Sequence, residues 1–538
     1  MASKSKSKNR IAVLDFETDP FLYGRIPEPF TCGVYDGEYY QDFWGDDCAD
    51  QLAEYIREEL QNYTIYAHNG GKFDFYFLME HLEEDLKIIG GRIAKCKIGE
   101  ATLTDSYLIL PLSLSAYQKD EIDYKIFEYG ERDKPKNKKA ILAYQKSDCI
   151  YLYEWVSKFI NRFGKKLTLA GTAFNELKKT EYEPKSTNEY YDDVFRQFYY
   201  GGRVQTFKTG EIEGDYTYID INSAYPYAML FEHPYDSKYI EKIKIPNDDE
   251  WGGYFAHIKA ISKGALPFRN PDDNKLYFYM DDISRDYFVT GWEILAGLKT
   301  GTLEIIKIHR VYVHERKKNF SEYVNKFYEE KLQSKLNGDK DNELFSKLML
   351  NSCYGKFGQD GRQFKDYQLL PFNCVPEDYK PEGENEWSLY AEHETGFCIW
   401  EKPAPVDRFY NVATAASITG FVRAYLWEAI CSSENPIYCD TDSLMCEKFH
   451  GKLGNELGQW KIEAELDQLY IGGRKFYAVH DKENDEWKTA CKGARLSAEQ
   501  IINTIKHNEP FVWKKDAPSY SLRFGARFLE RKISMQKS

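Results

Sequence analysis

The sequence has no CxxC pair, and its number of cysteines is odd. Eleven cysteines are scattered over 538 residues. Structural zinc sites usually draw ligands from closely spaced cysteines, and disulfide frameworks are typical of short secreted chains. The pattern argues against both, and we expect reduced thiols and a cytoplasmic protein.

Long apolar runs and internal repeats are also missing. A membrane-spanning helix needs about 18 consecutive apolar residues, and no stretch of this sequence approaches that length. We therefore expect no membrane contact. No segment recurs at a fixed period, which argues against a repeat architecture.

The chain also lacks net positive charge. Its formal net charge is −14, which argues against a protein that coats nucleic acid through bulk charge. A nucleic-acid enzyme stays compatible, because it needs only a local basic groove and its metal sites add carboxylates. Tyrosine and phenylalanine are abundant, with 43 and 33 copies, and they suit both core packing and stacking on unpaired bases.

Length and hydrophobic periodicity predict several domains. At roughly 150 residues per domain, the chain has room for about three to four domains. Strands predicted at 11–16 and 64–68, with helices at 48–60, from Phe75 and at 138–162, favour an α/β domain over about residues 1–165. Further along we predict a polar linker at 185–193, a strand at 217–221, two helices within 318–357, an inserted loop region at 358–408, a helix at 413–430 and a hairpin at 436–446.

A first set of acids lies in the N-terminal region. Asp15 and Glu17 form D-x-E at a strand end, where residues two apart share a face and repel each other unless a cation lies between them. Asp74 follows the second strand, and Asp148 comes four residues after Tyr144, on the same helical face. Four acids from three elements suit two Mg²⁺ ions about 3.5–4 Å apart, with Tyr144 orienting a water. A lone acid would be a solvated surface charge; the ordered set favours a metal site.

This arrangement resembles the exonuclease domain of the DnaQ-like superfamily in its Y-x3-D form. The match covers about residues 10–155.

A second set of acids lies in the C-terminal two thirds. YIDINSAYP places Asp220 at a strand end, and YCDTDS places Asp440 and Asp442 at a hairpin turn. Acids two apart at a turn need a counter-ion. We expect Asp220 and Asp442 to bridge a second pair of Mg²⁺ ions, one activating a primer 3′-OH and one binding a nucleoside triphosphate, while Asp440 supports the primer end.

Between these acids, KLMLNSCYGKFG predicts a helix. Lys347, Asn351 and Tyr354 recur at i, i+4 and i+7, so they share a face that offers a cation, an amide and a ring. Lys331, upstream, is a second candidate phosphate ligand. Alone, the pattern would fit a plain amphipathic surface helix; beside two acidic motifs it favours a nucleotide site.

Here the sequence resembles the family B DNA polymerases. DxxS-x-YP, K-x3-N-S-x-YG and YxDTDS stand where that family has its motifs A, B and C. The resemblance implies that Tyr225 excludes the ribose 2′-OH, that Lys347 and Asn351 contact the triphosphate, that Tyr354 lines the nascent base pair, and that Ile221 and Lys331 belong to the same nucleotide site. Two departures are Ala224, where Leu is usual, and Cys353 before the Tyr.

Within the family, the chain is most similar to the protein-primed branch of phages and linear plasmids. YYGGR matches that branch's Y-x-GG linker motif, and KFY matches its K-x-Y motif, with Lys475 on phosphate and Tyr477 near the last sugar. Ser106–Tyr107 stands where the branch has Ser-Leu, and Lys119 is a candidate auxiliary exonuclease lysine. The DNA contacts implied are His68, Asn69, Phe73, Ser106, Tyr107, Lys119, Tyr199, Gly201, Gly202, Arg423, Thr441, Lys475 and Tyr477.

The resemblance implies a multidomain α/β and α+β fold, with an RNase H-like exonuclease domain followed by a right-hand polymerase. The expected parts are exonuclease 1–185, linker and first palm segment 186–230, insertion 231–318, fingers 319–357, insertion 358–408, palm 409–492 and thumb 493–538. In the resembling enzymes such insertions grip a terminal protein and encircle the template; a solvated loop is the alternative for both. Arg523, Arg527, Arg531 and Lys532 are candidates for backbone contacts from the thumb, or a charged surface tail.

The implied function is template-directed DNA synthesis with 3′–5′ proofreading, protein-primed and strand-displacing. The implied partners are primer–template DNA, deoxynucleoside triphosphates and a terminal protein, bound by a monomer with two Mg²⁺ ions per active site, or Mn²⁺. The alternatives are a DNA-primed family B polymerase, a stand-alone nuclease and a non-catalytic replication scaffold.

Overall fold

The computed structural model describes residues 10–20, 26–83, 85–246, 251–380, 386–393, 396–404, 410–523 and 525–535. The chain divides into two compact units. Unit 1 contains Met1–Thr172, Gly361–Asp407 and Lys515–Arg531, and unit 2 contains Ala173–Asp360, Arg408–Lys514 and Lys532–Ser538. All eleven cysteines lie in the described part of the chain and are free thiols. None of the described helices combines the length and the apolar character that a membrane crossing requires.

Unit 1 is built on a sheet whose ten described strands run in the order β19-β20-β18-β5-β6-β7-β4-β1-β2-β3. Within it, β1 is parallel to β4 and β4 to β7, while the other pairs are antiparallel. The strands are β1 (Ile11–Thr18), β2 (Pro29–Tyr35), β3 (Tyr40–Trp44), β4 (Thr64–Ala67), β5 (Asp85–Ile89), β6 (Arg92–Ile98), β7 (Ala101–Asp105), β18 (Lys365–Pro371), β19 (Ser388–His393) and β20 (Phe397–Pro403).

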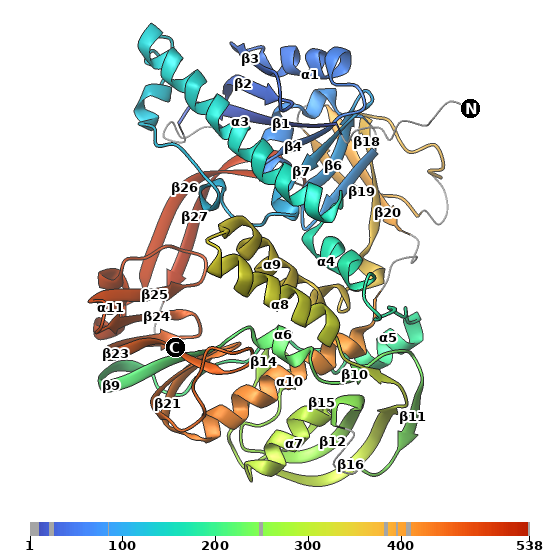
Figure 1. Ribbon diagram of the computed structural model, residues 1–538, viewed down its shortest axis with the longest axis vertical. Coiled ribbons are helices and arrows are strands. Elements are labelled where there is room, and N and C mark those ends of the chain that lie inside the picture. Colours follow the sequence, from blue (N-terminus) through green and yellow to red (C-terminus); the bar gives the residue numbers. More distant parts are fainter. Residues whose placement is uncertain are drawn as a thin grey trace. The chain divides into compact units, whose positions relative to one another are not determined.

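Helices cover this sheet through apolar faces at helical spacing. In α1 (Cys48–Glu59) the buried residues are Cys48, Leu52, Ala53 and Ile56, and they join the main core of unit 1. The long α3 (Pro135–Phe163) packs on β1 and β2, and Figure 1 shows it crossing the face of these strands. Proline in its first turn suits a helix start, and Gly164, with φ of 81°, ends it. The helices predicted at 48–60 and 138–162 are confirmed.

Three local predictions are wrong. Residues 358–408 are not simply loop, because β18 pairs with β5 and extends the sheet, and Leu369, Ala391 and Ile399 contribute to the core. The helix expected from Phe75 is only α2 (Asp74–Phe77). Inside the expected linker, α5 (Glu189–Arg196) begins at Glu189, because the side chain of Asn188 caps its first turn.

Unit 2 has an antiparallel sheet whose seven described strands run in the order β25-β24-β23-β9-β22-β21-β8. The predicted strand at 217–221 is the end of β9, and the predicted hairpin at 436–446 is β21 with β22. The strands are β8 (Val204–Thr206), β9 (Gly210–Ile221), β21 (Ser433–Asp440), β22 (Ser443–Phe449), β23 (Trp460–Gly473), β24 (Phe476–Asp481) and β25 (Glu486–Cys491).

The first predicted insertion folds into a second sheet, in the order β11-β16-β12-β15. Its strands are β11 (Tyr239–Lys242), β12 (Tyr254–Ser262), β15 (Ser284–Thr290) and β16 (Leu303–His314). The helix α7 (Gly291–Lys299) packs on β12, β15 and β16, and α10 (Val412–Cys431) packs on α7 and β15. The helix predicted at 413–430 is therefore confirmed.

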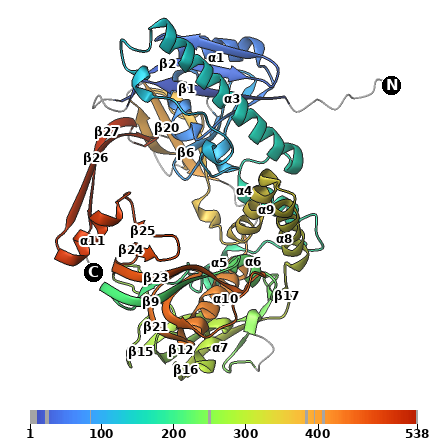
Figure 2. The same ribbon diagram turned by 60° about the vertical axis from the view of Figure 1, so that its left-hand side comes forward.

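Two helices form a hairpin in unit 2. α8 (Ser321–Leu336) and α9 (Lys340–Ser352) pack against each other, and they lie side by side in Figures 1 and 2. Gly338, with φ of 71°, makes the turn between them. The remaining elements used below, or completing the chain, are α4 (Leu169–Leu177), α6 (Ala224–Ala228), β10 (His233–Pro234), β13 (Phe268–Arg269), β14 (Leu276–Tyr277), β17 (Lys317–Lys318), α11 (Ala498–His507), β26 (Phe511–Ser521) and β27 (Gly525–Met535).

Candidate active sites

Unit 1 brings the predicted N-terminal acids together. Asp15 and Glu17 lie on β1 and Asp148 on α3, and one carboxylate oxygen from each lies within 4.8 Å of the others. Asp74 opens α2, and its Oδ1 accepts a hydrogen bond of 3.1 Å from the backbone NH of Phe16. The packing of α3 on β1 is therefore what assembles the cluster.

The cluster is electrostatically unfavourable without a cation. Burial, together with repulsion from the neighbouring acids, raises the pKa of Asp15 well above its usual range and raises that of Glu17 to about 8. Burial raises the pKa of Asp74 to about 7. Asp148 Oδ1 is buried without a hydrogen-bond partner. These oxygens are the ligands that Mg²⁺ prefers, so the residues fit a divalent metal site.

Lys119 and Tyr144 flank these acids as predicted. Lys119 Nζ lies 3.1 Å from Asp148 Oδ2 and 5.3 Å from the centroid of the Tyr144 ring. The Tyr144 hydroxyl lies 3.1 Å from the hydroxyl of Tyr124, a residue that the sequence analysis did not single out. The one feature of the sequence that could have pointed to Tyr124 is its position five residues after Lys119, in the same segment.

A cleft of about 740 Å³ opens beside this cluster. Glu17 and Phe73 line it together with Tyr124. The Phe73 ring is held edge-on to Phe77, with centroids 5.1 Å apart. Phe73, which the resemblance implies as a DNA contact, therefore has room for a ligand beside it.

Ser106 requires a correction. Its side chain is 0% exposed, its hydroxyl donates to the Ala67 carbonyl at 3.1 Å, and it lies 3.1 Å from His68 Nδ1. It therefore orients His68 rather than contacting DNA directly. Asn69 accepts a 3.0 Å hydrogen bond from Arg92, whose guanidinium lies over the Tyr107 ring at 4.8 Å.

Unit 2 assembles the second set of acids. Asp220 is the penultimate residue of β9, Asp442 lies in the turn between β21 and β22, and Ser443 pairs with Asp220 across the strands. The NH of Ile221 donates to the Asp442 carbonyl at 2.8 Å. Burial and the charge of Asp442 raise the pKa of Asp220 to about 7; burial and the charge of Asp440 raise that of Asp442 to about 6. Asp220 and Asp442 therefore also fit a divalent cation.

Asp440 has a different environment from these two acids. Its Oδ2 lies 3.0 Å from Lys475 Nζ and accepts a 3.2 Å hydrogen bond from Tyr438, while Thr441 donates to Oδ1 at 3.1 Å. Tyr477 packs edge-on against Tyr438, with ring centroids 5.2 Å apart. The K-x-Y motif thus lies directly against the hairpin acid.

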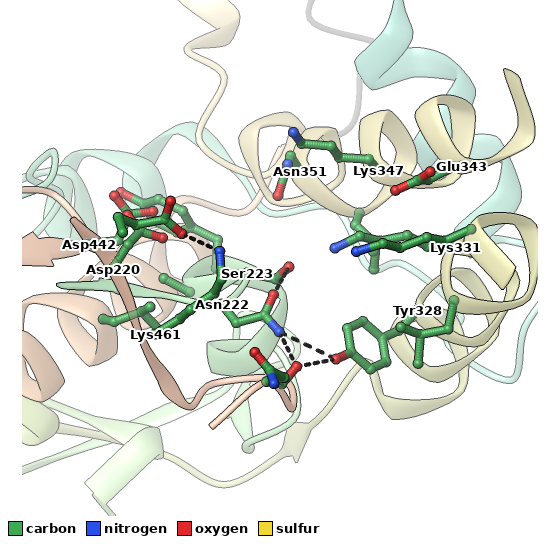
Figure 3. A pocket seen from close by; sticks show the side chains of 18 residues that line it. Asp220, Asn222, Ser223, Tyr328, Lys331, Glu343, Lys347, Asn351, Asp442 and Lys461 are labelled. Carbon is green, nitrogen blue, oxygen red and sulfur yellow. Dashed lines mark hydrogen bonds and ion pairs between the residues drawn. The ribbon is translucent and has the colours of Figure 1, made fainter. Parts of the chain in front are cut away.

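Beside Asp220 and Asp442 lies a cavity of about 780 Å³. Figure 3 shows the two acids on one side and Lys331, Lys347 and Asn351, from α8 and α9, on the other. Burial and the neighbouring charge of Lys347 lower the pKa of Lys331. A site with acids on one side and cations on the other suits a metal-bound triphosphate.

Further lining residues of this cavity escaped the sequence analysis. Lys335 follows Lys331 by one helical turn, and that i, i+4 spacing was the available signal. Asn222 and Ser223 lie within the YIDINSAYP motif, but the sequence analysis gave them no role. The others come from segments with no recognised motif, and only the fold places them here. The unpredicted lining residues include Asn222, Ser223, Tyr328, Lys335, Asn455, Lys461 and Glu463.

Two rings from distant segments stack beside the cavity. Tyr225 lies in α6 and Tyr354 follows α9, and their ring centroids are 4.3 Å apart with an interplanar angle of 8°. Tyr225 lines the cavity. The two positions that the sequence assigned to the nucleotide site are thus in direct contact.

Arg423 requires a second correction. It is 2% exposed, pairs with Glu293 Oε1 at 2.7 Å, and donates to the carbonyls of Tyr200 and Gly201 at 2.8 and 2.9 Å. A template cannot reach it, so its role is to hold the Y-x-GG segment.

The Y-x-GG segment lies close to the hairpin acids. Gly202 approaches Thr441 so closely that an added Cβ would lie 2.8 Å from its side chain, so only glycine fits there. Tyr199 lies beside Gly358, where an added Cβ would lie 2.6 Å from the tyrosine hydroxyl. Gly201 is exposed, with open space where its Cβ would be.

Known proteins resemble the chain over nearly its whole length. The family model described as DNA polymerase type B, organellar and viral, matches residues 116–453. The DNA-directed DNA polymerase of Enterobacteria phage PRD1 is 36% identical, over 99% of this chain and 99% of its own length. A probable DNA polymerase of Agaricus bitorquis is 26% identical, over 87% of this chain and 71% of its own length.

Solved structures share the fold. Phi29 DNA polymerase complexed with primer–template DNA matches with a TM-score of 0.74 at 17% identity, covering 98% of this chain and 100% of that one. The mixed α/β, multidomain architecture agrees with the expected fold. From the family match and the similarity to the PRD1 enzyme, the chain belongs to the organellar and viral type B DNA polymerases.

Proposed function

We propose that this polymerase extends a primer on a DNA template at the unit 2 site and removes mispaired ends at the unit 1 site. One observation carries the proposal. Each unit holds its own set of carboxylates with raised pKa values, and only the set in unit 2 faces a cavity lined by lysines from a helical hairpin.

In the synthetic reaction, Asp220 and Asp442 would hold two Mg²⁺ ions, or Mn²⁺. When bound, these ions lower the pKa of the primer 3′-OH and neutralise charge on the triphosphate. Lys331 and Lys347 bind the triphosphate, and Asn351 contacts it beside them. Lys475, paired with Asp440, holds the primer end.

The Tyr225–Tyr354 stack supplies the floor of the nucleotide site. The Tyr225 ring is held from one side by its stacking on Tyr354, so it resists displacement by a bulkier sugar and a ribose 2′-OH meets it as a clash. The stack therefore selects deoxynucleotides by shape rather than by a hydrogen bond.

In the editing reaction, Asp15, Glu17, Asp74 and Asp148 would hold divalent cations, which supply activation of the attacking water. Tyr144 orients that water. Lys119 offsets negative charge next to Asp148. Phe73 and the segment around His68, Asn69 and Tyr107 hold the frayed primer end.

The subdomain assignments follow from these roles. We assign the exonuclease to 1–185, the first palm segment to 186–230, the fingers to 319–357, the palm to 409–492 and the thumb to 493–538. The segments 231–318 and 358–408 are the two insertions.

We further propose a monomer that starts synthesis from a terminal protein and displaces the non-template strand. Protein priming is supported by the resemblance of the Y-x-GG segment and the K-x-Y motif to those of the protein-primed branch, and both lie against the acidic hairpin. Covalent transfer of a deoxynucleotide to a terminal protein, followed on a denaturing gel, tests this. A DNA-primed family B polymerase would extend DNA primers but never label such a protein.

The central experiment uses a 5′-labelled primer on a longer template with Mg²⁺, with and without the four deoxynucleotides. Wild type should extend the primer with nucleotides and degrade it without them. Asp442→Ala should only degrade it. Asp215→Ala is the matched control, because Asp215 lies on β9 with an exposed carboxylate that pairs with Lys482, and it should behave as wild type. Extension by Asp442→Ala at the wild-type rate would refute the assignment.

A further inference from the structure

Three ligand-type side chains meet on the sheet built from residues 231–318. His257 lies on β12, Asp286 on β15 and His309 on β16, and one donor atom from each lies within 4.8 Å of the others. Among the described residues, the only other such group is the acidic cluster of unit 1. The chemistry of synthesis and editing uses none of these three residues.

A β-bulge brings the two histidines together. His257 pairs with Arg310, but the next residue, Ile258, pairs with Ile308, so His309 is the extra residue of β16. In a regular strand, side chains alternate between the two faces of the sheet. A bulge interrupts this alternation and changes the direction in which a side chain points. The two imidazole rings lie face to face, with centroids 4.5 Å apart and planes at 27°.

The carboxylate comes from the strand on the other side of β12. Asp286 lies two residues before Phe288, the cross-strand partner of His257, so it occupies the same face of the sheet. Its Oδ1 lies 2.7 Å from His309 Nε2 and 3.8 Å from His257 Nε2. A simple His309–Asp286 hydrogen bond explains the first distance. It does not explain why a second imidazole nitrogen points at the same oxygen.

These distances suit a tetrahedral ion. Zinc binds imidazole nitrogen and carboxylate oxygen at about 2.0–2.2 Å, which places two donors of a tetrahedron about 3.3 Å apart. The observed separations of 2.7 and 3.8 Å bracket that value. Small side-chain rotations would therefore suffice to admit the ion.

The surroundings hold His257 in place and leave the site accessible. His257 stacks on Phe288 with centroids 4.2 Å apart and planes at 11°, and Phe288 packs on Phe198 in a buried aromatic cluster. The side chains of His257, His309 and Asp286 are 30%, 28% and 54% exposed. Solvent can therefore supply the ion and its remaining ligand.

Two cationic side chains lie near the three ligand-type residues. Lys259, opposite Asp286, and Arg310 oppose a cation. Arg310 is partly engaged by Glu241 at 3.4 Å. We expect the site to bind less tightly than a closed cysteine site.

We propose that His257, Asp286 and His309 bind one Zn²⁺ ion, which links β12, β15 and β16. Two imidazoles and one carboxylate are the donor set of open zinc sites and of other borderline first-row ions, whereas Mg²⁺ prefers oxygen ligands alone. The ion would stabilise this sheet, and it would do so independently of the proposed catalytic sites.

The test uses the full-length protein, stripped with EDTA and returned to excess Mg²⁺ so that the carboxylate sites are filled. Co²⁺ is added as a spectroscopic probe, because nitrogen-ligated tetrahedral Co²⁺ absorbs visible light far more strongly than octahedral all-oxygen Co²⁺. Zn²⁺ affinity is measured by competition with a chromophoric indicator. The variants are His257→Gln, His309→Gln and the control His81→Gln, whose imidazole pairs with the Asp50 carboxylate at 2.7 Å.

We expect one Co²⁺ per chain with strong visible bands that Zn²⁺ displaces. Loss of an outer-shell partner typically costs 10- to 100-fold in metal affinity, so each site variant should lose at least about 100-fold and the bands as well. His81→Gln should keep both. Circular dichroism in EDTA checks that all variants are folded. Absence of the bands in wild type, or their persistence in His257→Gln and His309→Gln, would establish that the three residues form only a hydrogen-bonded cluster.

Discussion

The carboxylates of Glu17 and Asp74 lie where burial opposes ionisation. Burial raises the pKa of Glu17 from its ordinary value of 4.5 to about 8 and that of Asp74 from 3.8 to about 7. The unfolded chain would release these protons at lower pH than the folded chain does. Their contribution to stability is therefore fully present below about pH 4 and is lost as the pH rises through about 7 to 8.

This difference predicts a pH-dependent stability in the absence of metal. In EDTA, the melting temperature of the unit that contains these acids should fall by several degrees between about pH 5 and pH 9. Added Mg²⁺ should restore it at the high-pH end, because a bound cation favours the charged forms. Thermal melts followed by circular dichroism measure this.

Asp74→Asn provides the control for that measurement. The amide keeps the shape of the side chain and does not titrate, so the fall in EDTA should become shallower. An equally steep fall in the variant would show that other groups cause it.

Tyr225 yields a second prediction at the residue scale. Tyr225→Val removes the ring that stacks on Tyr354, and incorporation of ribonucleotides relative to deoxynucleotides should rise about 10- to 100-fold. Tyr225→Phe keeps the ring and should keep the discrimination. Single-nucleotide insertion kinetics give the two kcat/KM ratios; similar ratios for Val and Phe would mean that another group excludes the ribose.

In the helical hairpin of α8 and α9, two lysines of the same helix have different surroundings. Lys331 lines the cavity, while Lys326 on the same helix pairs with Glu176 at 3.3 Å. Of these two lysines, Lys331 is thus the one placed to contact a ligand in the cavity.

We expect Lys331→Ala to raise KM for deoxynucleotides about 10- to 100-fold, the worth of one charge-assisted hydrogen bond. Its exonuclease activity should stay unchanged. Lys326→Ala is the matched control on the same helix and should leave KM near the wild-type value. Steady-state extension at varied nucleotide concentration tests both; an equal rise in KM would indicate a general effect on the hairpin.

The helix α10 contributes a buried ion pair between Arg423 and Glu293. Arg423→Met leaves Glu293 buried and unpaired, which should cost about 3–5 kcal/mol of stability. Adding Glu293→Gln should recover part of that loss. Thermal melts measure both variants.

The same variant distinguishes a buried role from template binding. If Arg423 contacted DNA phosphate, Arg423→Met would reduce the slope of log affinity against log salt by about 1. Since the side chain is buried, we expect no change in that slope. Fluorescence anisotropy on primer–template DNA over a salt series measures it.

At the scale of the whole molecule, the two acid sets belong to different compact units. Each set is completed by segments of its own unit, so the two activities should be separable. Asp15→Ala combined with Asp74→Ala should reduce exonuclease activity at least about 1,000-fold while primer extension stays within about twofold of wild type. The labelled-primer assay with and without nucleotides measures both, and a matching loss of extension would argue against two independent sites.

Much of this organisation was predictable from sequence. D-x-E, Y-x3-D and YCDTDS are short patterns whose members lie within a few residues of one another, so local geometry alone places them on one face. The long helices α3 and α10 were also predictable, because their apolar periodicity runs over many turns. The 358–408 segment was not, because its Gly, Pro and acidic residues obscure the short strands β18, β19 and β20, of which β18 pairs with β5.

The sequence by itself determined the family resemblance, the two acidic motifs and the basic helix face, because each depends on residue types at fixed local spacing. Tertiary structure alone decided which side chains are accessible. It buried Ser106 and Arg423, since their hydrogen-bond partners lie on segments distant in sequence. It also brought His257 to Asp286 and His309, because pairing of three strands and one bulge, rather than spacing along the chain, sets those distances.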